Sequence, residues 1–205
     1  MNAILTADIV KSTVMPQKAF EDLINKLKAF FINEQQDFFN GDSFRVLIAD
    51  PNEALLKCIK SRLIAIQYTV NEQIDIRISI NIGTLKTKKI DLRSSMDDLL
   101  VTSGRSFAKL QDTSKRLFIT ADNKEKDFTY SIIAEYTDSL IGQLTAKQAK
   151  VLFELLSGKS QVETAALLKL STATVSKQLK AARYDELKSM LVKFEILTTQ
   201  LKNGN

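Results

Sequence analysis

The chain has 205 residues, 44% of them hydrophobic and 26% charged, so it is long enough for one large domain or two smaller ones with a hydrophobic core. It contains no histidine, which excludes hydrolases with a Ser-His-Asp triad and zinc enzymes with histidine ligands. Its single cysteine, Cys58, excludes an intramolecular disulfide and is expected to be a small core residue. The apolar runs are too short to span a bilayer and the first residues lack a signal-peptide pattern, so we expect a cytoplasmic protein that does not contact membranes.

The excess positive charge is confined to the last third of the chain. Residues 141–205 hold ten Lys and Arg against five Asp and Glu, whereas residues 1–140 hold 19 of each kind. A basic segment beside a neutral one indicates a module that binds a polyanion.

A smaller basic loop is expected to be solvated, with contact to an anionic ligand as the alternative; its cations are Lys86, Lys88, Lys89 and Arg93.

The first two-thirds of the chain alternates strand and helix patterns. The expected order is a strand at 3–10, a helix at 18–32, hairpin strands at 37–39 and 43–49, a helix beginning at Asn52, a strand at 75–84, a helix at 96–110 and a strand at 117–120.

Two local patterns support this order. The segment Asn40-Gly41-Asp42 favours a tight hairpin, because Asn and Gly tolerate positive φ. Over residues 74–82, five isoleucines alternate with polar residues, which predicts a strand with one face buried and the other exposed. The order of elements predicts an α+β fold with a ferredoxin-like βαββαβ core.

The second part of the chain is predicted to be helical. Residues 122–136 are polar and then apolar, and we interpret them as the start of a linker. Thr145 is expected to cap a helix that ends at Ser157-Gly158. The expected domains are residues 1–138, which are α+β, and residues 139–205, which are all-α.

Residues 160–182 have the pattern of a helix-turn-helix, whose second helix enters the major groove of DNA. Ser160 and Glu163 form a capping box that fixes the start of the first helix. The expected turn is Lys169-Leu170-Ser171, with Lys169 at a position where glycine is usual. In the second helix Val175 and Leu179 are expected to face inward, onto Ala166, Leu167 and Leu170.

The outward face of that second helix begins with short side chains and continues with cations. Short side chains allow a helix to approach base edges, and lysines reach phosphates. Double-stranded DNA is therefore the expected partner; a helical hairpin used for protein contacts is the alternative. The expected cap is Ser171 or Thr172, the expected base contacts are Thr172, Ala173, Ser176 and Lys177, and the expected phosphate contacts are Lys159, Lys169, Lys180 and Arg183.

A further helix is expected over residues 184–201. Its apolar residues recur at steps of three and four, as in a short coiled coil. This seam either packs back on the DNA-binding module or pairs with its copy in a homodimer. The seam consists of Leu187, Met190, Phe194, Leu197 and Leu201.

Two aspartates in the first part are candidate metal ligands. Asp8 ends the first strand and Asp42 lies at the tip of the hairpin, which is adjacent to that strand in a ferredoxin-like sheet. Their carboxylates could bind one cation, with Mg²⁺ expected, while Lys11, Ser12 and Thr13 face the phosphate of a nucleotide. Alternatively, Asp8 caps the next helix and Asp42 is only a turn residue.

Most of residues 1–120 carries four short motifs in order. They are ADIVKST at 7–13, GDSF at 41–44, RISINIG at 77–83 and GRSFA at 104–108. In these motifs the chain resembles the SatD-like proteins and, more remotely, class III nucleotide cyclase domains. The resemblance implies metal binding by Asp8 and Asp42, and it agrees with a C-terminal helix-turn-helix, which SatD-like proteins carry.

Three positions depart from the cyclase pattern. Phe38 replaces a lysine that selects the base, and Ala108 and Asp112 replace an asparagine and an arginine that stabilise the reacting phosphate. These groups neutralise charge on the transferring phosphate. We therefore assign no catalytic residue.

The sequence thus predicts a DNA-binding transcription regulator with a degenerate cyclase-like domain. That domain would sense a nucleotide with Mg²⁺ or bring two copies together as a homodimer. The alternative is a divergent Mg²⁺-dependent nucleotidyl or phosphoryl transferase that uses Asp8 and Asp42. A third interpretation is a protein-interaction module that binds its partner through the terminal helices.

Overall fold

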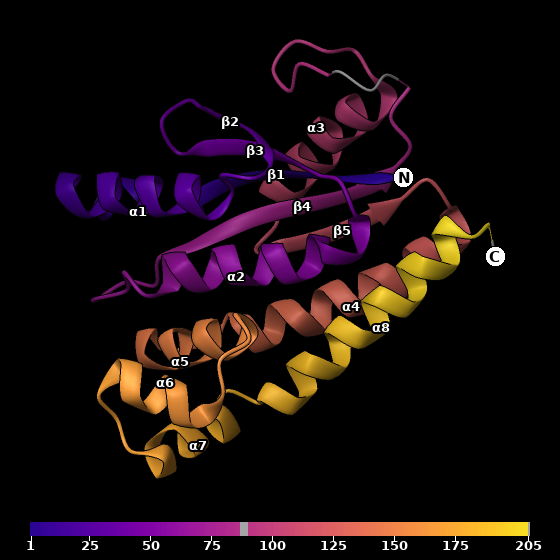
Figure 1. Ribbon diagram of the computed structural model, residues 1–205. Helices are drawn as coiled ribbons and strands as arrows, with labels where there is room; N and C mark the ends of the chain where they lie inside the picture. Colours follow the sequence, from indigo (N-terminus) through magenta and orange to yellow (C-terminus); the bar gives the residue numbers. More distant parts are fainter. Residues whose placement is uncertain (87–89, 205) are drawn as a thin grey trace.

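The computed structural model describes residues 1–86 and 90–204, which form an α+β fold with helices on both faces of one sheet (Figure 1). The strands are β1 (Asn2–Val10), β2 (Gln35–Phe39), β3 (Ser43–Ile48), β4 (Asp75–Gly83) and β5 (Leu117–Ala121). The α-helices are α1 (Gln17–Phe30), α2 (Ala54–Ile66), α3 (Asp98–Gln111), α4 (Lys124–Ile141), α5 (Ala146–Leu156), α6 (Gln161–Leu168), α7 (Thr172–Ala181) and α8 (Tyr184–Lys202), with 3-10 turns η1 (Ser12–Val14) and η2 (Pro51–Glu53). Among the described residues, none of the helices combines the length and the apolar character that crossing a bilayer requires.

The sheet has the strand order β2-β3-β1-β4-β5. Strand β1 lies at its centre and pairs antiparallel with both β3 and β4, whereas β4 and β5 are parallel. The register places Ala7 opposite Phe44 on one side and Ile78 on the other, so the apolar residues of three strands share one face. Helices α1, α2 and α4 cover this face.

The prediction of a half-buried strand at 75–84 is wrong in one respect. Strand β4 is at the predicted place, but Ser79 is 0% exposed and Asn81 is 1% exposed. Helix α3 covers the second face of the sheet and provides hydroxyl partners there, with Ser103 bonded to Thr6 at 2.7 Å. Polar residues on the second face are thus buried beneath a helix, which provides partners for Thr6 and for Nδ2 of Asn81 but, among the described residues, none for the hydroxyl of Ser79.

Two boundaries also differ from the prediction. Residues 124–136, expected in a linker, belong to α4, which begins where the Asn123 side chain accepts hydrogen bonds from the amides of Glu125 and Lys126. The expected domain boundary after residue 138 falls within this helix. Asn52 does not cap α2: it lies in η2, which Asp50 caps by accepting from the Asn52 N–H, and α2 follows η2 with Glu53 at its N-cap position.

The hairpin turn forms as predicted, with positive φ at Asn40 (51°) and Gly41 (84°). The cations of the basic loop are placed only in part, since Lys88 and Lys89 lie outside the described residues. Lys86 pairs with Asp98 at 2.5 Å and Arg93 pairs with Asp37 at 2.9 Å, each in an exposed ion pair.

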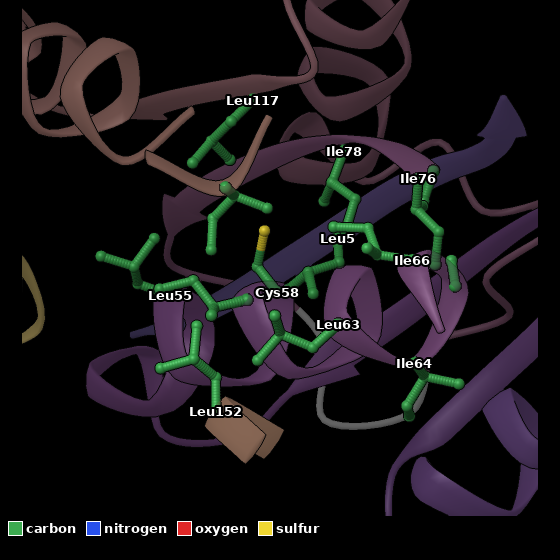
Figure 2. Packing of buried hydrophobic residues seen from close by; sticks show 14 of the residues in the cluster. Leu5, Leu55, Cys58, Leu63, Ile64, Ile66, Ile76, Ile78, Leu117 and Leu152 are labelled. Atoms are coloured by element: carbon green, nitrogen blue, oxygen red, sulfur yellow. The ribbon is translucent and has the colours of Figure 1, made fainter. Parts of the chain in front are cut away.

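Helix α2 is buried on two sides. Figure 2 shows Leu55 and Leu63 of α2 between the sheet, represented by Leu5 and Ile78, and Leu152 of α5. Cys58 is also buried here, as predicted, and burial raises the pKa of its thiol to about 12. The C-terminal helices α5 to α8 therefore pack on the side of α2 opposite the sheet (Figure 1).

A buried ion triad joins three of these elements. Arg62 of α2 is 0% exposed and binds both carboxylate oxygens of Asp75 in β4, at 2.9 and 2.7 Å. It also donates to Asp138 of α4 at 2.7 Å, and Asp138 in turn accepts from the Arg116 N–H at 2.8 Å. Burial alone would lower the pKa of Arg62, but the two carboxylates raise it above its ordinary value.

The triad predicts a large loss of stability for Arg62→Met. The substitution keeps apolar volume but leaves Asp75 buried without a counter-charge, which costs about 3–5 kcal/mol. Urea unfolding should show this loss, and Arg105→Met, on the exposed surface of α3, should change the free energy of unfolding by less than about 0.5 kcal/mol. Equal effects of the two substitutions would contradict the assigned role of the triad.

Candidate nucleic-acid interface

Helices α6 and α7 have the local signals that the sequence predicted. The Ser160 hydroxyl accepts from the Glu163 N–H, and the Glu163 carboxylate accepts from the Ser160 N–H at 2.7 Å, so the capping box is confirmed. The Ser160 N–H holds the pKa of Glu163 below its ordinary value. Ser171 caps α7 by accepting from the Thr174 N–H at 3.1 Å.

The turn between α6 and α7 is tight. Lys169 has φ 55° and ψ 45°, the left-handed conformation, and the Leu170 N–H donates to the Ala165 carbonyl at 2.9 Å. This bond closes the end of α6 in the manner of a Schellman motif. A lysine thus occupies a backbone conformation that glycine adopts without cost.

The set of residues buried between α6, α7 and the rest of the protein differs in part from the prediction. Val175 and Leu179 of α7 are buried, as expected. Their expected partners Ala166, Leu167 and Leu170 are exposed, however, with Leu167 at 54% and Leu170 at 40%. The buried residues of α6 are Thr164 and Ala165, because α6 turns a different face toward α7 and α5.

The opposite face of α7 is free of contacts with the sheet. Its exposed residues near the start of the helix have short side chains, and its exposed residues further along are lysines. Among the described residues, Lys169, Lys177 and Lys180 form no ion pair. The exposed set is Ser171, Thr172, Ala173, Ser176, Lys177 and Lys180.

Two other cations of the predicted interface have partners within the chain. Lys159 pairs with Glu154 of α5 at 2.7 Å. Arg183 donates to Glu186 at 2.7 Å and to the Tyr136 hydroxyl at 2.8 Å, so it joins the start of α8 to α4. Glu186 raises the pKa of Arg183. Either cation would have to exchange or share its carboxylate to contact a phosphate.

The apolar seam of α8 packs within its own chain. Phe194 lies 5.8 Å from Tyr130 of α4 between ring centroids, and Thr198 meets the Tyr130 hydroxyl at 3.1 Å. Leu187, Met190 and Phe194 are buried. The seam thus packs mainly on Tyr130 and its neighbours in α4, which lie outside the expected DNA-binding module, and it contacts α7 of that module to a lesser extent.

Asp8 lies in β1 and Asp42 lies in the hairpin turn before β3, and the two have separate partners. Asp8 accepts from the Gln111 amide at 3.1 Å, and its Oδ1 lies 3.9 Å from Nε of Arg77. Asp42 accepts from the Ser12 hydroxyl at 2.7 Å. The Ile9 N–H donates to the Asp42 carbonyl at 3.0 Å, which joins the hairpin turn to the end of β1.

The surroundings of the Asp8 carboxylate bear on whether Asp8 and Asp42 could share one Mg²⁺ ion. Asp8 Oδ1 is buried without a hydrogen-bond partner, which favours a cation, but the Arg77 guanidinium already lies beside it. Each of the two carboxylates thus has its own neighbour within the chain, Arg77 beside Asp8 and Ser12 bonded to Asp42. A metal ion held by both stays a prediction that requires the Asp8 side chain to leave Arg77.

The predicted nucleotide loop lies between β1 and α1. Lys11 has φ 62° and its ammonium pairs with Glu72, so the lysine points away from Asp42 toward another loop. Ser12 and Thr13 form η1 beside the hairpin turn, and both line a shallow hollow with Asp42. Ser12 and Asp42 are thus brought together, whereas Lys11 is not.

The sequence analysis missed the polar layer between α3 and the sheet. Asn81 donates from Nδ2 to Ser106 at 2.9 Å and to Thr120 at 2.6 Å, in addition to the contact of Thr6 with Ser103. A signal was present, because Ser103 and Ser106 are three apart on one helix face.

No family model matches the sequence, and none of the curated proteins matches it. Among solved structures, the chain is similar to one titled "Crystal structure of the guanylyl cyclase Cya2", with a TM-score of 0.42 and 18% identity. The match covers 58% of this chain and 74% of that chain.

The positive φ of Lys169 predicts opposite effects for two Lys→Gly substitutions. Lys169→Gly should raise the free energy of unfolding by about 0.5–1 kcal/mol, because glycine relieves the left-handed strain at some cost in chain entropy. Lys177→Gly, in the middle of α7, should lower it by about 1 kcal/mol. Chemical unfolding of the two variants measures both values, and a destabilising Lys169→Gly would contradict the assigned turn.

Proposed function

We propose that the protein is a DNA-binding transcription regulator in which α6 and α7 form a helix-turn-helix and α7 enters the major groove. The observation that carries the proposal is the exposed face of α7, on which short side chains precede lysines without ion pairs. Thr172, Ala173 and Ser176 are short enough for the helix backbone to approach base edges. Lys177 and Lys180 follow on the same side and can reach a base edge and a phosphate.

The position of α7 in the fold supports this proposal. Helix α7 contacts α5, α6 and α8, and its buried residues Val175 and Leu179 face these helices. A duplex could therefore approach the other face without unfolding any element. The charge distribution agrees, since all of the net positive charge lies in residues 141–205.

For the first part of the chain we propose a ferredoxin-like, nucleotide-cyclase-like domain of the SatD-like kind. The order β2-β3-β1-β4 and the antiparallel pairing of β1 with both neighbours support the topology. Its proposed role is to sense a nucleotide with Mg²⁺ near Asp8, Asp42 and the loop 11–13, or to bring two copies together. A ligand would act by favouring one arrangement of the α7 helices over another.

DNA binding predicts a steep salt dependence. Fluorescence anisotropy on genomic fragments should show affinity falling by orders of magnitude between about 50 and 200 mM salt. Lys177→Ala should weaken binding about tenfold or more, through loss of a base contact. Lys180→Ala should lower the slope of log K against log salt by about one, through loss of a phosphate contact.

The matched control is Lys193→Ala, which removes an exposed lysine from α8 and should leave affinity and slope unchanged. Three outcomes would contradict the proposal: no binding to any fragment, binding that does not depend on salt, or equal losses for Lys177→Ala and Lys193→Ala. Each of these outcomes would show that α7 is not the helix that contacts DNA.

A further inference from the structure

A small cavity lies between α3 and the ends of β4 and β5. Its volume is about 370 Å³, within the range of sites for small molecules. Asp122 lines it from the loop after β5 and Asp127 from the first turn of α4, while Thr102, Ser106 and Thr120 line it from α3 and β5. None of these residues belongs to the proposed DNA interface.

Asn81 on the cavity wall has an unpartnered polar atom. The residue is 1% exposed, and its Nδ2 donates to Ser106 and Thr120, which both line the cavity. Its Oδ1 is buried without a hydrogen-bond partner among the described residues. A buried acceptor left unpaired is costly, so a donor brought by a ligand would recover free energy here.

The two carboxylates are held in place by backbone amides. The Thr84 N–H donates to Asp122 at 3.3 Å, and the Ala121 N–H donates to Asp127 at 3.0 Å. Gly83 permits the position of Asp122, because a Cβ at residue 83 would lie 2.2 Å from the Asp122 Oδ2. Each carboxylate uses one oxygen in this way, which leaves the other oxygen for a ligand.

The charge of the residues that line the cavity indicates which kind of ligand it can bind. Two carboxylates face the cavity, and no described lysine or arginine lines it. Ile82, Leu99 and Ala121 add an apolar wall that suits a carbon chain. The lining is less suitable for a divalent metal ion, because the described residues contain no group of three His, Cys, Asp or Glu side chains that could hold one.

We propose that this cavity binds the ammonium group of a small organic amine. An ammonium group has three N–H donors, and three acceptor groups surround the cavity: Asn81, Asp122 and Asp127. The carbon chain of the amine would lie against Leu99 and Ile82. This site is independent of DNA binding, so either proposal can fail without the other.

The test is a titration of the full chain with propylammonium chloride, followed by ¹H–¹⁵N NMR. The amides of Thr84 and Ala121 should shift saturably, because they donate to the carboxylates that bind the ammonium. The uncharged isostere 1-propanol and matched NaCl should not shift them. Asp122→Asn should weaken the binding at least about tenfold, and Asp127→Asn serves as a second variant should the first not fold.

Asp112→Asn removes an exposed acid at the end of α3 and should leave the affinity unchanged. The proposal is overturned if the two amides do not shift with propylammonium, or if 1-propanol shifts them equally. Saturation by MgCl₂ without any response to propylammonium would also overturn it, in favour of a metal site. Equal losses in Asp112→Asn and Asp122→Asn would show a general charge effect instead of a site.

Discussion

The contact of Arg62 with Asp75 and Asp138 is the constraint on which the rest of the structure depends. It joins α2, β4 and α4 in the interior, where a lone charge would be very costly. Because Asp138 also receives the Arg116 N–H, α4 is fixed to the start of β5. Helix α5 follows α4 and packs on α2, and α7 packs on α5, so the triad helps to set where α7 lies relative to the sheet. The α+β part of the chain and helices α5 to α8 thus share one hydrophobic core.

Local signals in the sequence predicted most elements. The capping residues of α5 and α6, the Asn40-Gly41 turn and the isoleucine period of β4 depend on neighbours in the chain, so their outcome could be predicted. The predictions that failed concern features that depend on contacts between residues far apart in the sequence. Nothing near Ser79 indicates that α3 will cover it, and nothing near Arg62 indicates its two acidic partners. The start of α4 was missed because a polar stretch precedes its apolar residues and resembles a linker.

The same distinction holds for the candidate sites. The exposed face of α7 could be predicted, since helical period and a cap determine which residues point outward. The sequence could not show which cations remain without an ion pair. Glu154 pairs with Lys159 and Glu186 pairs with Arg183, and both pairs depend on how the side chains are placed in the folded structure. Adjacency of Asp8 and Asp42 was also predicted from the strand order. Their separate partners, Gln111 and Arg77 for Asp8 and Ser12 for Asp42, depend on tertiary contacts that the sequence does not specify.

The most direct test of the central claim is hydrogen–deuterium exchange of the full chain with and without a bound genomic duplex. The account predicts slower exchange of the amides at 171–180, with little change in β2 and β3 at the far edge of the sheet. Protection of the sheet in place of α7, or no protection by any duplex, would contradict it.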